Sequence, residues 1–226
     1  MIRGTLIGAI LALVSTDACA LQVVVKPVWW RDNRGGRDIV LYVYGPSVEG
    51  DFAKVTKGWR NAKRLNPGKK LVGLEIGGHG GGDSLNAEWI GDWAAKNQIS
   101  VILSGDCVSA CSYIALSALG QGRLFVASST ARVGVHQAIY RETNETAWDY
   151  IAHSARQLNR YRAPREAIEA MRTTPTGDMT YLNARQLLLW GAHRRIPLTL
   201  SERFWTWLSG TWLELARWVN SQGWLA

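Results

Sequence analysis

One short stretch combines the residue types that a nucleophilic serine needs. Ser109 stands between Cys107 and Cys111 in the sequence DCVSACSY, directly after an apolar run and before an apolar helical pattern over 110–119. A turn from a buried strand into a helix exposes its side chain, and the free N–H groups of the helix N-terminus make that end electropositive. Ala110 adds a backbone N–H beside the hydroxyl, as an oxyanion donor requires. The pattern predicts Ser109 as a nucleophile.

A second loop is unusually rich in glycine. The sequence EIGGHGGGDS, residues 75–84, has five glycines in six consecutive positions, which leaves its N–H groups bare. It lacks the Lys-Ser/Thr of a phosphate loop and the spacing of a dinucleotide loop. Two interpretations stay open: a flexible turn, and a loop whose N–H groups point into a site.

His136 is the natural general base. It ends the sequence VGVH, so its side chain can project over the edge of a strand. A lone histidine is more often structural than catalytic. Acyl transfer needs a nucleophile, a base and N–H donors, and the presence of all three in one chain favours the catalytic interpretation. His79 and Asp83 form only a weak metal pattern, so no metal site is predicted.

The elements that must position these residues alternate between strands and helices. β-Branched and apolar runs predict strands, and apolar residues at helical spacing predict helices. The expected strands are 38–45, 70–76, 99–105, 123–128 and 131–138, and the expected helices are 48–65, 84–96, 110–119, 144–162 and 164–174. This alternation predicts an α/β layered fold with parallel strand pairing.

The combined pattern resembles a known family. A glycine-rich loop after a strand, then a serine in a turn of small residues, then a Val-x-x-His strand are similar to the Clp protease (ClpP-like) serine peptidases of the ClpP/crotonase superfamily. The Cys-x-Ser-Ala-Cys turn resembles that of exported, periplasmic members. The resemblance covers about residues 38–192. It implies an α/β fold of repeated β-β-α units, a serine-type endopeptidase (hydrolase) acting on polypeptides, assembly into a homo-oligomer, and no cofactor.

The resemblance also assigns roles to residues. It makes Ser109 the nucleophile and His136 the base, and it takes the oxyanion N–H groups from Ala110 and from Gly81 or Gly82. The segment DMTYLNARQLLLWGA, residues 178–192, resembles the family segment that holds the triad aspartate, which points to Asp178. Asp178 lies one residue further from the following aromatic than the family pattern has it.

Three rival interpretations follow the same motifs. A Ser-Lys peptidase needs a lysine that reaches the serine, and the sequence has none after Lys96. A crotonase-type acyl-CoA enzyme would use the glycine loop, but no carboxylate pair is evident and coenzyme A is scarce outside the cytoplasm. The third rival is a catalytically inactive ClpP-like scaffold or interaction protein.

The first twenty residues predict export. One early cation, an apolar run and a small-x-small ending over 18–20 make residues 1–20 a signal peptide, cleaved after Ala20, with anchoring by the uncleaved segment as the alternative. Cleavage removes Cys19 and leaves Cys107 and Cys111 in an oxidising compartment, where disulfides persist. Their spacing across a turn allows a bridge. The other interpretation is two small buried thiols.

The remainder divides into a ClpP-like domain, 21–196, and a tryptophan-rich amphipathic segment, 197–226. The latter holds five of the twelve tryptophans. A helix there would seat at a membrane surface, pack on its own domain, or cover a neighbouring subunit. The net charge of +8 is scattered along the chain without a nucleic-acid motif. The charge therefore fits solvated helix faces that could lie near anionic lipid, and we expect no nucleic-acid partner.

Overall fold

The computed structural model describes residues 20–28 and 38–195. These residues form nine strands and six helices. The strands are β1 (Gln22–Pro27), β2 (Ile39–Tyr44), β3 (Leu71–Ile76), β4 (Val101–Leu103), β5 (Asp106–Val108), β6 (Leu124–Val126), β7 (Arg132–Val135), β8 (Thr180–Asn183) and β9 (His193–Arg194). The helices are α1 (Asp51–Leu65), α2 (Ser84–Lys96), α3 (Cys111–Gly120), α4 (Trp148–Arg160), α5 (Arg165–Thr173) and α6 (Ala184–Leu189).

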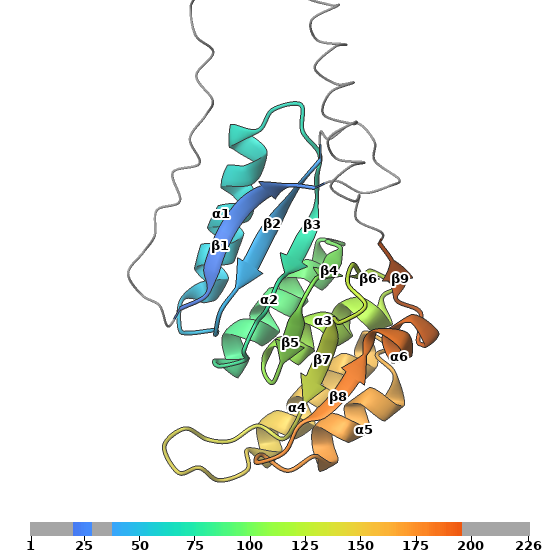
Figure 1. Ribbon diagram of the computed structural model, residues 1–226. Helices are drawn as coiled ribbons and strands as arrows, with labels where there is room; N and C mark the ends of the chain where they lie inside the picture. The colour runs from blue at the N-terminus through green and yellow to red at the C-terminus, as the bar shows by residue number, and fades with distance from the viewer. Residues whose placement is uncertain (1–19, 29–37, 196–226) are drawn as a thin grey trace, which may run out of the picture.

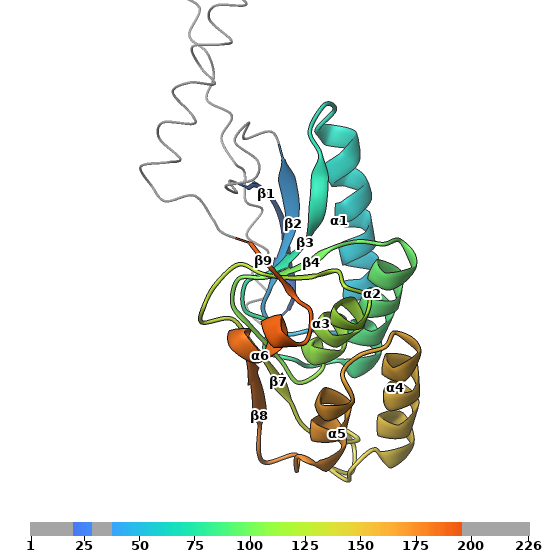
Figure 2. The ribbon, with the colours of Figure 1, turned by 90° about the vertical axis from the view of Figure 1, so that its right-hand side faces the viewer.

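The larger sheet has the strand order β1-β2-β3-β4-β6-β9. Its neighbours pair in parallel, except β1, which runs antiparallel to β2. Helices α1, α2 and α3 lie together on one face of this sheet (Figure 2). This is the arrangement that alternating strands and helices favour, because each crossover places a helix against the sheet.

A smaller sheet with the order β5-β7-β8 lies at one end of the larger one (Figure 1). Strand β5 pairs in parallel with β7, and β7 pairs antiparallel with β8. Helix α5 lies beside this sheet and α4 lies against α5 and α3, at the end of the molecule away from α1 (Figures 1 and 2).

The chain passes from the larger sheet to the smaller one twice. It leaves β4 through Ser104 and Gly105 into β5, and it leaves β6 through a short loop into β7. Each crossing gives two strands followed by a helix, the repeated β-β-α unit. A side chain at Gly105 would lie 2.8 Å from the backbone carbon of Gly77. The loops that follow β3 and β4 therefore touch at the crossing.

Helix α3 occupies the centre of the core. Every residue from Cys111 to Leu119 is buried. A helix enclosed on all sides must be apolar all round, which explains the run of small and aliphatic residues. Its N-terminus is thereby fixed at the point where the two sheets meet.

The structure confirms the α/β fold of repeated β-β-α units. It corrects the single strand expected over 99–105, which is β4 followed after two residues by β5 in the other sheet. The sequence patterns missed α6 and the strands β1, β8 and β9, and the helix expected over 144–162 begins only at Trp148. Of the predicted signal peptide, 1–20, the structure describes only Ala20. The predicted tryptophan-rich segment, 197–226, lies outside the described residues. Within the described ranges, none of the helices is long and apolar enough to cross a membrane.

Candidate active site

Ser109 sits in the tight turn between β5 and α3. Its φ angle is +54°, a left-handed conformation that is strained for a residue with a side chain. Its N–H donates to the carbonyl of Gly134 on β7 (2.8 Å), and its carbonyl accepts the N–H of Ser112 (2.9 Å). Both bonds hold the strained turn, and strain of this kind concentrates at functional sites.

A disulfide closes the same turn. Cys107 and Cys111 are bonded to each other, with their Cα atoms 5.2 Å apart, which is the bridge that their spacing allowed. Both residues are buried, one at the end of the small sheet and one at the start of α3. The covalent link therefore encloses Ser109 between two fixed points.

His136 meets Ser109 directly. It follows the last residue of β7, and its Nε2 lies 2.7 Å from Ser109 Oγ. Its Nδ1 lies 2.7 Å from the carbonyl oxygen of Gln137. A carbonyl only accepts hydrogen bonds, so Nδ1 carries the ring proton and donates it there. Nε2 is then left as the acceptor for the Ser109 hydroxyl, which is the tautomer that a general base requires.

The backbone around Gln137 is tied to the end of α5. The N–H of Gln137 donates to the carbonyl of Thr174 (2.9 Å), and its side-chain amide donates to the carbonyl of Arg172 (2.7 Å). Thr174 is buried and pairs its hydroxyl with that of Thr180 (2.8 Å). The carbonyl that orients the imidazole is thus held in place by two elements.

Asp178 does not reach the imidazole. Its N–H closes a turn to the carbonyl of Pro175 (3.0 Å), and its side chain is exposed. Within the described residues its carboxylate makes no hydrogen bond or ion pair. The pairing of Val135 with Thr180 marks the end of the β7–β8 ladder, and Asp178 lies beyond that end, where the chain turns toward solvent. The structure brings Ser109 and His136 together and leaves Asp178 apart.

The glycine loop packs against the nucleophile. Gly81 has a φ of +84°, and a Cβ built on it would lie 2.5 Å from Ser109 Cβ. Only glycine fits this approach. The carbonyl of Gly81 accepts the N–H of Ser47 (2.6 Å), so the N–H of Gly82, on the far side of the same trans peptide, points away from Ser47. Among the described residues, neither the Gly82 N–H nor the Ala110 N–H has a hydrogen-bond partner.

The N–H of Gly81 is already used. It donates to Nδ1 of His79 (3.2 Å), whose side chain is only 1% exposed. Burial lowers the pKa of His79 to about 4, so the ring is neutral near pH 7. Because Nδ1 accepts, Nε2 carries the proton, and within the described part of the chain this buried donor has no partner. Asp83, the other half of the weak metal pattern, caps α2 through the N–H of Asn86.

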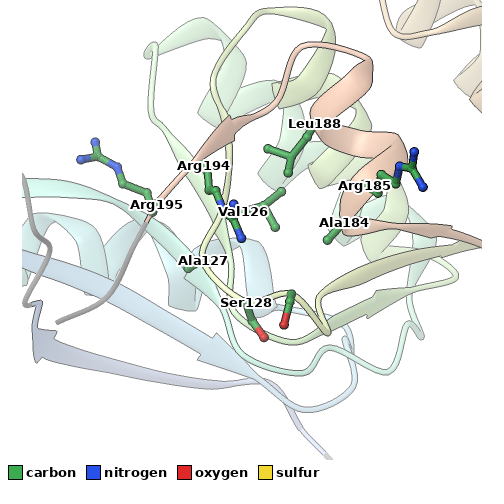
Figure 3. A pocket seen from close by; sticks show the side chains of 9 residues that line it. Val126, Ala127, Ser128, Ala184, Arg185, Leu188, Arg194 and Arg195 are labelled. Atoms are coloured by element: carbon green, nitrogen blue, oxygen red, sulfur yellow. The ribbon is translucent and has the colours of Figure 1, made fainter. Parts of the chain in front are cut away.

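A small cavity lies beside the Ser109–His136 pair. Its walls come from the first turn of α3, from α4 and from Met171 of α5. A much larger cavity of about 550 Å3 lies elsewhere, between β6, α6 and β9 (Figure 3). Its arginines do not converge, since the guanidinium groups of Arg185 and Arg195 point to opposite sides (Figure 3). The chemistry therefore belongs to the smaller cavity.

Comparison with solved structures shows which known fold this chain shares. A single-residue mutant of ClpP1 from Listeria monocytogenes matches with a TM-score of 0.51 and 17% identity, over 72% of this chain and 93% of that one. The ClpP1 of the same organism without that mutation matches with a TM-score of 0.51 and 15% identity, over 72% of this chain and 92% of that one. No family model matches the chain, and no curated protein does. At these identities the likeness shows the fold, which is ClpP-like.

Proposed function

We propose that this chain is a serine-type endopeptidase in which Ser109 is the nucleophile and His136 the general base. The observation that carries the proposal is the 2.7 Å contact between Ser109 Oγ and His136 Nε2, in the tautomer that accepts the hydroxyl proton. The left-handed turn at Ser109 supports it, because strained backbone conformations cluster at functional sites.

The mechanism follows from the groups present. His136 Nε2 takes the Ser109 proton as Oγ attacks the scissile carbonyl, and the N–H groups of Ala110 and Gly82 are free to hold the resulting oxyanion. The imidazolium then gives its proton to the leaving amine, and a water molecule hydrolyses the acyl-enzyme by the same steps. The Gln137 carbonyl takes the orienting role that Asp178 was expected to fill.

Export and self-association complete the proposal. A disulfide is characteristic of an oxidising compartment, and Leu21, the residue directly after the predicted cleavage site, is buried. A periplasmic or secreted homo-oligomer that cleaves polypeptides fits these features and the ClpP-like fold. The segment 197–226 would supply a membrane-surface or subunit contact.

One observation favours a second function, a catalytically inactive scaffold. The Gly81 N–H is turned toward His79, and no carboxylate contacts His136 within the described residues. An alkyl fluorophosphonate probe separates the two functions. We expect it to label the purified mature protein at Ser109.

The variants Ser109→Ala and His136→Ala should lower labelling by about three orders of magnitude or more, because such residues act as a unit. Their matched controls are Ser117→Ala, a buried hydroxyl elsewhere in α3, and His153→Ala on α4, which should label as the wild type does. A folded wild-type protein that takes no label would establish the scaffold.

A further inference from the structure

The cavity that Ser109 and His136 line is small. Its volume is about 30 Å3, far below the 550 Å3 of the cavity between β6, α6 and β9. Tyr150, Ile151 and Met171 line the small cavity together with the catalytic pair. Ile151 and Met171 are buried in the core.

The aromatic walls are anchored by hydrogen bonds. The hydroxyl of Tyr150 donates to the carbonyl of Ser84 (2.9 Å), and that of Tyr113 donates to Asp92 (2.9 Å). The hydroxyl of Tyr161 donates to the same carboxylate oxygen of Asp92. Swinging either wall ring aside would break a bond of a largely buried hydroxyl, which is unfavourable. These hydrogen bonds therefore oppose enlargement of the cavity by movement of either ring.

The position of the cavity fixes what must fill it. When Ser109 Oγ bonds to a carbonyl carbon, the substituent on the adjacent α-carbon lies within a few ångströms of that oxygen. The cavity beside Ser109 is where this substituent fits. Ser112, which is 4% exposed and lines the same cavity, has a hydroxyl without a hydrogen-bond partner among the described residues.

We propose that this site selects acyl groups whose residue at the scissile bond has a small side chain, alanine or serine. The inference rests on the proposed function, because it assumes that Ser109 is acylated. A leucine or phenylalanine would have to displace the anchored rings or the buried aliphatic wall. A mismatch of even one methylene in such a pocket changes the rate by roughly 10- to 200-fold.

A series of peptidyl phosphonate diphenyl esters, identical except for alanine, serine, leucine or phenylalanine at the reacting residue, tests the proposal. The alanine and serine probes should label Ser109 at least about tenfold faster than the other two. Equal rates, or faster labelling by leucine, would overturn the inference while leaving the peptidase proposal intact. A small alkyl fluorophosphonate runs in parallel, and its failure to label would overturn the proposed function and this inference together.

Matched variants locate the selectivity in the wall. Ile151→Ala widens the cavity, and Ile168→Ala removes an equally buried isoleucine from α5 that does not line it. Relative to wild type, Ile151→Ala should raise the leucine-to-alanine rate ratio about tenfold or more, and Ile168→Ala should leave that ratio unchanged. Ile151→Val gives the same test, with a smaller change, if the alanine variant does not fold. An unchanged ratio in a folded Ile151 variant would show that this wall does not select the side chain.

Discussion

Replacing Gly81 by alanine tests whether the glycine loop is fitted to the nucleophile turn. The added Cβ would lie 2.5 Å from Ser109 Cβ and 3.1 Å from the carbonyl oxygen of Val108, on a backbone with a φ of +84°. The turn cannot easily move away from the added methyl group, because the N–H of Ser109 donates a hydrogen bond to the carbonyl of Gly134 and a disulfide closes the turn. The methyl group must therefore displace the loop itself.

The magnitude has two parts. A residue with a side chain in the left-handed region costs about 1–2 kcal/mol. Overpacking a fixed contact costs about 1–3 kcal/mol more, so we expect the free energy of unfolding to fall by roughly 2–5 kcal/mol. Gly78 and Gly80 in the same loop separate the two parts. An added Cβ meets nothing within 4 Å at either position, and only Gly78 has a positive φ, of +134°.

The assay compares urea denaturation and fluorophosphonate labelling for the three alanine variants. Gly80→Ala should lie within about 0.5 kcal/mol of wild type and label normally. Gly78→Ala should lose about 1–3 kcal/mol from backbone strain alone. Gly81→Ala should lose the most and should label far more slowly, since the clash is with the reacting residue. If Gly81→Ala is as stable and as reactive as Gly80→Ala, the packing of the loop on Ser109 has been misjudged.

Further predictions concern the acid, the bridge, the buried histidine and the tail. Asp178→Asn should leave fluorophosphonate labelling within about twofold of wild type, and a loss of a hundredfold or more would restore Asp178 to the triad. Alkylation of unreduced exported protein followed by mass spectrometry should find Cys107 and Cys111 unmodified. Replacing both by serine should lower the free energy of unfolding, measured by urea denaturation, by about 2 kcal/mol, which is the chain-entropy value for so short a loop. Burial lowers the pKa of His79 from 6.5 to about 4, so the unfolded chain binds a proton at this residue more tightly than the folded chain does. The free energy of unfolding should therefore be at its full value above pH 6.5. It should fall by up to about 3 kcal/mol as the pH is lowered toward 4. His79→Gln should flatten that part of the stability curve, and an unchanged slope would contradict the assignment. Deleting residues 197–226 should leave the melt of the α/β domain cooperative and weaken self-association or membrane binding in sedimentation, whereas loss of the cooperative melt would make the tail ordinary core.

The parts of the site that the sequence predicted are those with a local signature. A serine between a strand and an apolar helix is placed by the turn itself, and a histidine directly after a strand is placed by the end of that strand. The α/β alternation then brings the two together, since β5 and β7 are neighbours in the small sheet. The direction of an exposed loop has no such signature. Asp178 was inferred from a resembling segment, and it lies past the end of the β7–β8 ladder with its side chain exposed.

His79 shows a different limit of sequence reasoning. Among five glycines it suggested only a weak metal ligand, and the structure shows it buried, with its Nδ1 accepting a hydrogen bond from the Gly81 N–H. Its burial arises from the bridge between His79 and Cys107, which joins segments 28 residues apart in the chain. The sequence offered one indication that His79 has a specific position: it is a large polar residue within a run that otherwise consists of glycine.

The partner of His136 Nδ1 is a peptide carbonyl, and this determines what mutational scanning of the chain can detect. Every residue type supplies the same carbonyl, so no substitution at position 137 deletes the group that orients the imidazole. An alanine scan would therefore report a two-residue site even though three groups cooperate in it. The third group is sensitive only to changes that move the backbone, and its position depends on the last turn of α5 through Arg172 and Thr174. Substitutions that loosen the C-terminal end of α5 would therefore lower activity even though they lie far from any catalytic side chain.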